Sequence, residues 1–438
     1  MKNLLKNKSL LTGGGLFIYF FLLLLGVLIP SLRLGTSGGF GTAFIYRAII
    51  FTIFFIIVII AFYEKYHTIN YVLAISLAIF FISNIVAIFV PFNNVNISLQ
   101  YRWMAVLYLS SIIFTVFAFY EVLNFYIDKR SIAVLFICII LTALVCALYS
   151  DIREFKEIVN AFTAEGEDAH FYQIHSFFDN KNSYGLVLFV ALIASIYLLL
   201  EYKNKWIIIP IVYLAINLIV SRSKTALIAL FLISLVIVGY YFMMSFKDHK
   251  KRNLVIVGCI LFLMIVGIVL ISVKEIYTSF SFLSHLSNYV REAFIGQALR
   301  SLDDRFSNLA LAKEIFLTPR IILGYGEHTC YSYANSCCYH LGYIDNAYIY
   351  NLLAGGVFKT ALFFYCYYLI FKNLLSLNKI ELPTIYKIFS WSIVISILLY
   401  GLMENYQILG SNHVSFIFLI LSYSLPSLFI KEVRTQSE

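Results

Sequence analysis

Apolar stretches long enough to cross a lipid bilayer recur along this chain of 438 residues. The hydrocarbon core of a bilayer is about 30 Å thick, so a helix needs about 20 apolar residues to cross it. Hydrophobic residues make up 61% of the sequence and charged residues only 13%, which excludes a soluble globular protein. Because a segment in lipid must satisfy its own backbone hydrogen bonds, we predict an all-α polytopic membrane protein.

We expect about twelve transmembrane helices in a single integral membrane domain that covers residues 1–438. No internal repeat and no low-complexity linker divides the sequence further. No small-residue cleavage site follows the first apolar stretch, so we interpret it as an uncleaved span rather than a signal peptide. The predicted spans are 16–32, 45–64, 70–91, 103–123, 131–150, 184–201, 206–220, 225–246, 253–273, 347–371, 386–404 and 413–430.

Lysine and arginine are unevenly divided between the loops on the two sides of these spans. When the N-terminus is placed in the cytoplasm, most basic residues fall on the cytoplasmic side, as the positive-inside rule requires. Both termini are then predicted to be cytoplasmic. The net charge of +9 reflects this loop bias, so we expect no nucleic-acid partner.

Two long loops lie on the extracytoplasmic side in this topology, at 151–183 and at 274–346. Within the second loop, residues 301–318 carry apolar side chains at helical spacing and end before Pro319. This pattern predicts an amphipathic helix that lies on the membrane surface or packs on the bundle.

Three of the seven cysteines lie in the second long loop. A disulfide from Cys330 to Cys337 or Cys338 is chemically allowed outside the cytoplasm, and the sequence leaves it open. The spacing of these cysteines and the histidines near them fits no standard zinc pattern, so we expect no metal site.

A short cationic segment, residues 221–227 (SRSKTAL), separates the apolar stretches 206–220 and 225–246. The predicted topology puts this cationic island, with Arg222 and Lys224, at the extracytoplasmic surface, where basic residues are otherwise few. One interpretation is an interfacial anchor whose charges reach the lipid headgroups. The other is a binding site for an anion.

Further charged residues are expected near the same surface. Arg305 belongs to the predicted amphipathic helix, and Arg47 lies just inside the second span. A guanidinium suits a phosphate or diphosphate because its planar fork binds two oxygens at once. Asp345, which opens the tenth span with Asn346, is a candidate general base, but both residue types are also good N-caps. The sequence leaves both roles of Asp345 open.

Several short polar or glycine-containing blocks stand beside the predicted spans on the extracytoplasmic side. They flank the two long loops and the cationic island, and Arg305 lies among them. The blocks are residues 177–185 (FFDNKNSYG), 221–226 (SRSKTA), 319–326 (PRIILGYG) and 345–350 (DNAYIY), the last followed by Gly355-Gly356.

Together these blocks resemble those of the bacterial O-antigen polymerase (Wzy) and O-antigen ligase superfamily. Their order, their spacing and the layout of twelve spans are similar over most of the chain. The resemblance implies a C-type glycosyltransferase-like membrane fold. It also implies inverting transfer of sugar units from undecaprenyl diphosphate, with no cofactor and no metal.

The family's residue roles can be carried to the matching positions of this chain. They make Arg222 and Arg305 the diphosphate binders, which neutralise the charge that grows on the leaving group. Asp345 becomes the base or the group that orients the acceptor. The expected substrate-binding residues are Asn182, Lys224, Asn346 and Arg47.

The resemblance therefore predicts a polymerase that joins O-antigen or capsule repeat units. It would act on the extracytoplasmic side of a bacterial cytoplasmic (inner) membrane, with a lipid-linked oligosaccharide as substrate and a chain-length regulator as a further partner. An O-antigen ligase is one alternative, which Asp345 disfavours because ligases have histidine there. A lipid-linked glycan flippase or transporter is another, which the absence of repeats disfavours.

Overall fold

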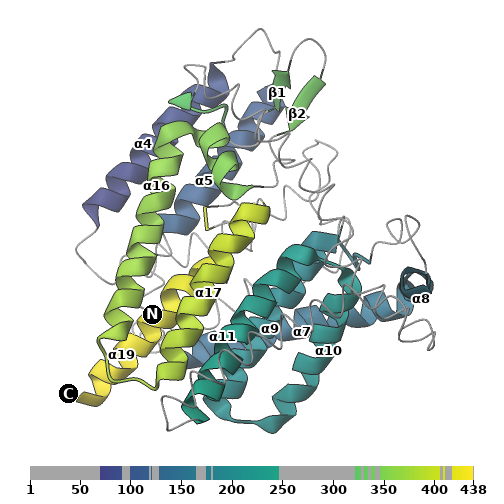
Figure 1. The fold of residues 1–438 in the computed structure, drawn as a ribbon. Coiled ribbons are helices and arrows are strands. Elements are labelled where there is room, and N and C mark those ends of the chain that lie inside the picture. The colour runs from purple at the N-terminus through teal and green to yellow at the C-terminus, as the bar shows by residue number, and fades with distance from the viewer. Residues whose placement is uncertain are drawn as a thin grey trace, which may run out of the picture.

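The computed structural model describes residues 70–90, 99–117, 120, 128–163, 174–178, 181–245, 321–326, 330–333, 337–340, 346–404, 408–409 and 417–437. This part of the chain is almost entirely helical, and its helices gather into one bundle (Figure 1). Five of the described helices are long and apolar enough to cross a membrane. The chain is therefore a helical membrane protein, as its composition predicts.

The five long apolar helices coincide with five predicted spans. Their ends differ from the predicted ones by a few residues, because polar residues near a span can extend the helix beyond its apolar part. The five are α4 (Tyr71–Phe89), α7 (Lys129–Arg153), α9 (Lys181–Tyr202), α16 (Ala347–Asn378) and α17 (Thr384–Met403).

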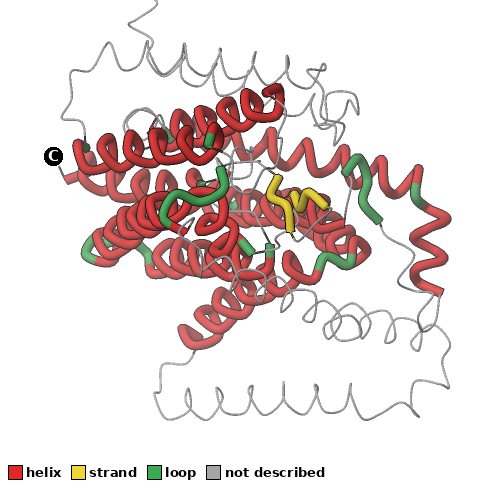
Figure 2. Tube along the Cα trace, turned by 90° about the horizontal axis from the view of Figure 1, so that it is seen from above, coloured by secondary structure: helices red, strands yellow, loops and turns green. Residues whose placement is uncertain are grey.

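Helices α10 (Ile208–Ser221) and α11 (Lys224–Ser245) coincide with the spans predicted at 206–220 and 225–246 to within two residues, and α5 (Leu99–Phe117) covers the span predicted at 103–123 in part. The spans predicted at 16–32, 45–64 and 253–273 lie outside the described residues. Short helix α8 (Phe155–Thr163) shows that part of the first long loop is helical, and it stands at the edge of the bundle in Figures 1 and 2. The remaining helices are η4 (Lys205–Ile207), the π-helical turn η8 (Ile420–Ser424) and α19 (Leu425–Ser437).

Side-chain caps begin several of these helices. The Oδ1 of Asn70 accepts a hydrogen bond from the backbone N–H of Leu73, at 3.2 Å, where α4 begins. The carboxylate of Asp128 accepts from the N–H of Ser131, at 2.7 Å, where α7 begins. Such caps satisfy backbone donors that the first turn of a helix cannot pair internally.

Helix α9 forms the centre of the bundle. It packs against α7, α10 and α11, while α11 packs against α17, and α17 against α16. In the spanning part of α9 72% of the residues are buried, against 39% for α4, which lies at the periphery. The described helices therefore place the start of α9, with residues 181–185, next to several neighbouring helix ends.

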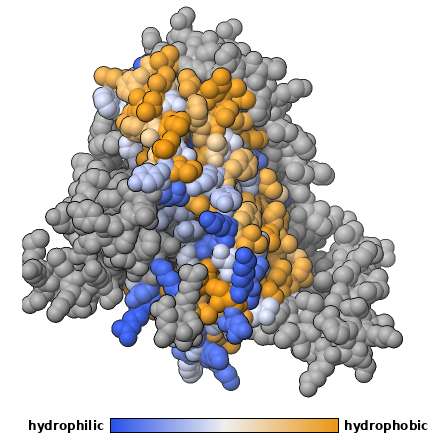
Figure 3. Space-filling model, turned by 90° about the vertical axis from the view of Figure 1, so that its left-hand side faces the viewer, coloured by the Kyte–Doolittle hydropathy of each residue, from blue (hydrophilic) through white to orange (hydrophobic). Residues whose placement is uncertain are grey.

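The outward faces of the helices are apolar. Helix α4, for example, exposes Val72, Ile75 and Ile82. Hydrophobic residues (orange) cover the upper part of the face in Figure 3, and hydrophilic ones (blue) gather toward its lower end. Exposed apolar residues over several helices are expected where lipid replaces water as the solvent.

Helix α16 is not a straight span, unlike the prediction for 347–371. Gly356 has φ 62° and ψ −156°, which breaks the helix into a short arm (347–355) and a long arm (357–378) (Figure 1). The ring centroids of Tyr348 and Phe363 are 5.4 Å apart, although these residues would be about 22 Å apart along an unbroken helix. The short arm therefore folds back beside the long arm.

A glycine-containing segment, residues 321–326, closes this break. The N–H groups of Tyr325 and Gly326 donate to the carbonyls of Leu353 and Ala354, at 2.7 and 2.8 Å. A Cβ atom on Gly324 would lie 2.5 Å from the backbone nitrogen of Gly356, so only glycine allows this approach. Two of the sequence blocks, 319–326 and Gly355-Gly356, therefore meet in the fold.

One short antiparallel strand pair departs from the all-α prediction. Strands β1 (Cys330–Tyr333) and β2 (Cys337–His340) pair within the second long loop. The register sets Cys330 opposite His340, Ser332 opposite Cys338 and Tyr333 opposite Cys337. Neither of the two cysteine pairs that the sequence suggested for a disulfide is therefore directly cross-strand.

Candidate functional site

The cationic island forms the tight turn between α10 and α11. Arg222 ends α10 in the left-handed conformation, with φ 54° and ψ 26°. The hydroxyl of Ser221 donates to the carbonyl of Leu218, at 2.8 Å, and accepts from the N–H of Ser223, at 3.3 Å. These bonds satisfy polar groups at the end of a helix, where the backbone has no partners of its own.

The island is buried rather than spread over the surface. Arg222 is 8% exposed, and its Nε atom and the Nζ atom of Lys224 are both buried. An anchoring side chain would extend its charge to the lipid headgroups or to water. The burial of both cationic groups therefore favours the anion-binding interpretation of the island over the interfacial anchor.

The start of α9 lies directly against the island. The Oδ1 of Asn182 accepts a hydrogen bond from the hydroxyl of Ser223, at 3.5 Å. A Cβ atom on Gly185 would lie 2.2 Å from the Cβ of Ser223, so glycine is what allows the two helices to approach. The blocks 177–185 and 221–226, far apart in sequence, are thus brought together.

Glu404 joins these segments, and sequence reasoning missed it. It lies at the C-terminal end of α17 and is 4% exposed. Its Oε1 accepts hydrogen bonds from the Nδ2 of Asn182, at 2.8 Å, and from the hydroxyl of Thr225, at 3.1 Å. A sequence signal did exist, because Glu404 is the one acidic residue in the long apolar region 382–431.

Basic residues belong to the segments that meet at Glu404. Lys181 is close enough to interact electrostatically with both Arg222 and Glu404. Lys224 precedes Thr225, whose hydroxyl donates to Glu404, so three basic residues belong to the segments that meet at this carboxylate. We call this cluster the Glu404 site; its members are Lys181, Asn182, Arg222, Lys224, Thr225 and Glu404.

Asn346 lies beside the end of α17 and acts as a cap. Its Oδ1 accepts from the N–H groups of Tyr348 and Ile349, both at 3.0 Å, and so begins α16. Its Nδ2 donates to the carbonyl of Leu402, at 3.0 Å, only two residues from Glu404. The capping interpretation of the 345–346 pair therefore holds for Asn346, which also ties α16 to the end of α17.

The predicted site residues fall into two groups. Asn182, Arg222, Lys224 and Asn346 converge at the same end of the bundle. Asp345, Arg305 and Arg47 lie outside the described residues, so their roles stay predictions. Among the residues that the structure describes, no group of three or more His, Cys, Asp or Glu side chains could hold a metal ion.

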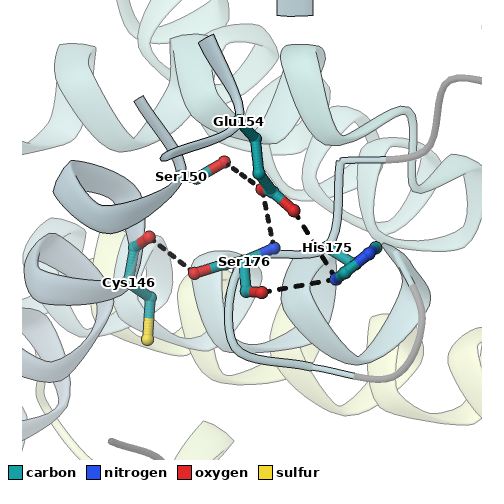
Figure 4. Close-up of polar contacts among 5 residues, drawn as sticks. All are labelled: Cys146, Ser150, Glu154, His175 and Ser176. Carbon is teal, nitrogen blue, oxygen red and sulfur yellow. Dashed lines mark hydrogen bonds and ion pairs between the residues drawn. The ribbon is translucent and has the colours of Figure 1, made fainter. Parts of the chain in front are cut away.

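A second polar cluster lies close to the start of α9 (Figure 4). Glu154 follows the last residue of α7, and its Oε2 accepts from the hydroxyl of Ser150, at 2.8 Å, and from the N–H of Ser176, at 2.9 Å. The Nδ1 of His175 is 3.5 Å from the Oε1 of Glu154. The hydroxyl of Ser176 donates to the carbonyl of Cys146, at 2.7 Å. We call these five residues the Glu154 cluster.

The Glu154 cluster fixes the chain that leads into α9. Phe177 stacks on Tyr149 with ring centroids 3.7 Å apart, and Phe178 stacks on Tyr184 at 6.3 Å. The hydroxyl of Tyr184 in turn donates to the Oδ1 of Asn217 in α10, at 3.1 Å. These contacts hold residues 174–178, and thus the start of α9, against α7 and α10.

The Glu404 site can attract and orient an anion at one end of the helix bundle. Its buried guanidinium and ammonium groups are charge-assisted donors, which are stronger than neutral ones in surroundings of low dielectric constant. Asn182 adds an amide, and Asn346 lies nearby. No protein-family model matches the chain, and no curated protein matches it in sequence.

Proposed function

We propose that this protein is a membrane glycosyltransferase that polymerises polysaccharide repeat units carried on a lipid diphosphate. The Glu404 site would bind the diphosphate of the donor. A lipid-linked glycan lies with its diphosphate at the membrane surface, and a site at the end of a spanning helix bundle matches that depth. The resemblance to O-antigen polymerases names the reaction class.

The single observation that carries this proposal is the buried, cationic and strained turn at Arg222. An arginine in the left-handed conformation costs about 1–2 kcal/mol compared with ordinary backbone. Glycine would end α10 at that position without this cost. A chain that keeps arginine there, with its Nε atom buried, uses the side chain for more than ending a helix.

Catalysis would depend on charge stabilisation. When the bond between the sugar and the diphosphate breaks, negative charge grows on the leaving diphosphate. Arg222, Lys224 and Lys181 would stabilise that charge in place of a metal cation, with Arg305 as a further binder. Asp345 is the proposed base, and Asn182, Asn346 and Arg47 are the proposed substrate contacts.

The finer features of the proposal follow from the sequence. They are twelve spans in a C-type glycosyltransferase-like arrangement, both termini in the cytoplasm, and an extracytoplasmic active site on a bacterial cytoplasmic membrane. A chain-length regulator is the proposed protein partner. None of these features requires a cofactor.

The test uses the full-length protein in nanodiscs, supplied with an undecaprenyl-diphosphate-linked repeat unit. We expect a ladder of lengthening glycan from the wild type and none from Arg222→Ala. Arg222→Lys keeps the charge but loses the bidentate geometry, so we expect partial activity. Arg305→Ala and Asp345→Asn test the proposed roles of those residues in the same assay.

Arg102→Ala is the matched control. Arg102 lies near the start of α5, and its Nη1 donates to the carbonyl of Phe89, at 3.0 Å, where α4 ends. This variant should keep the ladder. If Arg222→Ala folds and still makes a full ladder, the proposed role of the Glu404 site is wrong.

A lipid-linked glycan flippase is the second candidate, and the break in α16 favours it. Transporters often build their substrate sites from discontinuous helices. Movement of the lipid across the bilayer with no ladder would support this candidate. Transfer of a finished glycan to a different acceptor, again with no ladder, would instead support a ligase.

A further inference from the structure

The short helix α8, which follows α7, is amphipathic and has no role in the proposed function. Its apolar residues Phe155, Ile158 and Val159 are spaced three or four positions apart, so they lie on one side of the helix. The charged residues Lys156 and Glu157 fall outside that side. Such a division of apolar and charged residues is typical of a helix at the boundary between an apolar and a polar medium.

Only part of this apolar side packs against the helix bundle. Ile158 packs against the hydrophobic core, whereas Phe155 is 63% exposed and Val159 is 42% exposed. Water in contact with an aromatic side chain is unfavourable, and burial of such a side chain stabilises a helix at its site. The described residues therefore leave an apolar surface on α8 for a second apolar medium to cover.

This exposed surface continues the exposed apolar stripe of α7. Along α7, exposed apolar residues recur every three or four positions, and Phe155 and Val159 follow them at the same spacing. The residues of the stripe on α7 are Val134, Ile137, Leu141, Val145, Leu148 and Ile152. Because α7 is long and apolar enough to cross a membrane, its exposed stripe faces lipid. The surface that contacts lipid therefore extends from α7 onto α8.

Helix α8 runs across the direction of the spanning helices. In Figure 1 it is seen nearly end-on while the spanning helices lie along the picture, and in Figure 2 its length is visible. The chain turns at Glu154, directly after α7. The hydroxyl of Ser150 and the N–H of Ser176 donate to the Oε2 of Glu154 and hold this corner. A helix that lies across the spanning helices beside their apolar surface has the orientation of an interfacial helix.

We propose that α8 is an interfacial helix that inserts Phe155 and Val159 into the bilayer beside the end of α7. The apolar face of such a helix lies about 5–10 Å into the boundary between headgroups and acyl chains. Lys156 is exposed next to this face, and a lysine side chain can extend from an apolar surface to a lipid phosphate. Glu157 is exposed on the opposite side of α8, toward water. This inference does not depend on the proposed function.

Fluorescence quenching of the full-length protein in phosphatidylcholine nanodiscs tests the proposal. Phe155→Trp places a tryptophan on the apolar side of α8, and Glu157→Trp is the matched control on the opposite side. The emission of the wild type, which has three tryptophans, is subtracted. We expect brominated lipids to reduce the emission of Phe155→Trp, with a larger loss when the bromine lies near the headgroup than near the chain end. The emission of Glu157→Trp should respond to iodide in the water instead.

Two results would overturn the proposal. If iodide quenches Phe155→Trp as strongly as Glu157→Trp, α8 lies in water. If neither iodide nor brominated lipid quenches Phe155→Trp, protein covers this face, either from another part of the chain or from a second copy. Val159→Trp repeats the measurement from the same side of α8 if Phe155→Trp fails to fold. The measurement needs no glycan synthesis, so its outcome is independent of the test of the proposed function.

Discussion

Two buried or nearly buried glutamates follow the last residues of spanning helices, Glu154 after α7 and Glu404 after α17. Both lie near the start of α9, and both accept hydrogen bonds from a hydroxyl and an N–H group. Glu154, however, contacts two serines and one histidine from residues 150–176. Glu404 accepts hydrogen bonds from Asn182 and Thr225, which are far from it in the sequence and lie beside the cationic turn.

The difference separates a fold-stabilising cluster from the proposed ligand-binding one. A carboxylate that binds backbone N–H groups and nearby hydroxyls fixes a loop and needs no cation. The Glu404 carboxylate instead lies within electrostatic reach of Lys181 and next to the cationic island, and buried cationic groups can bind an anionic ligand. The two clusters resemble each other in hydrogen bonding. Variants at matched positions of the two clusters are therefore needed to tell their roles apart.

The largest effect is expected when glycine replaces one of two left-handed residues, Arg222 with φ 54° in the Glu404 site and Ser176 with φ 55° in the Glu154 cluster. Glycine at either position relieves the backbone strain. Arg222→Gly should keep thermal stability but lose activity on the order of a hundredfold or more, because a charge-stabilising donor is removed. Ser176→Gly should keep activity and lose only the bond to Cys146. Full activity in Arg222→Gly would contradict the proposed functional role of the Arg222 side chain.

A smaller effect is expected from crowding the contact between α9 and the island. Gly185→Ala would push against Ser223 and should lower the free energy of unfolding by about 2 kcal/mol, as overpacked cores do. Gly239→Ala is the control, since a Cβ there meets nothing within 4 Å. It should be neutral or slightly stabilising because alanine favours helix. Detergent-induced unfolding of both variants measures the difference, and equal stability would contradict the close contact.

The smallest effect is expected at His175 in the Glu154 cluster. Its side chain is 44% exposed, and its Nδ1 is 3.5 Å from Glu154, so solvent screens the interaction. His175→Ala should lower thermal stability by less than about 1 kcal/mol and leave glycan synthesis unchanged. A large loss of activity would show that the Glu154 cluster belongs to the functional site after all.

Most of the helical architecture that the structure describes could be predicted from the sequence. Apolar stretches of spanning length identify α4, α7, α9, α16 and α17, because the bilayer sets both their length and their composition. The fold-back of α16 at Gly356 could not be predicted. Apolar residues continue through the break, and only the contact with residues 321–326 shows how its backbone groups are satisfied.

The sequence by itself determined that this is a helical membrane protein and that a cationic turn separates two apolar helices. Both conclusions follow from local properties, namely hydropathy and charge along the chain. Only the tertiary structure decided that Asn182, Arg222 and Glu404 form one site. These residues are far apart in sequence, and the hydrogen bonds of Glu404 depend on how α9, α11 and α17 pack, which no local pattern encodes.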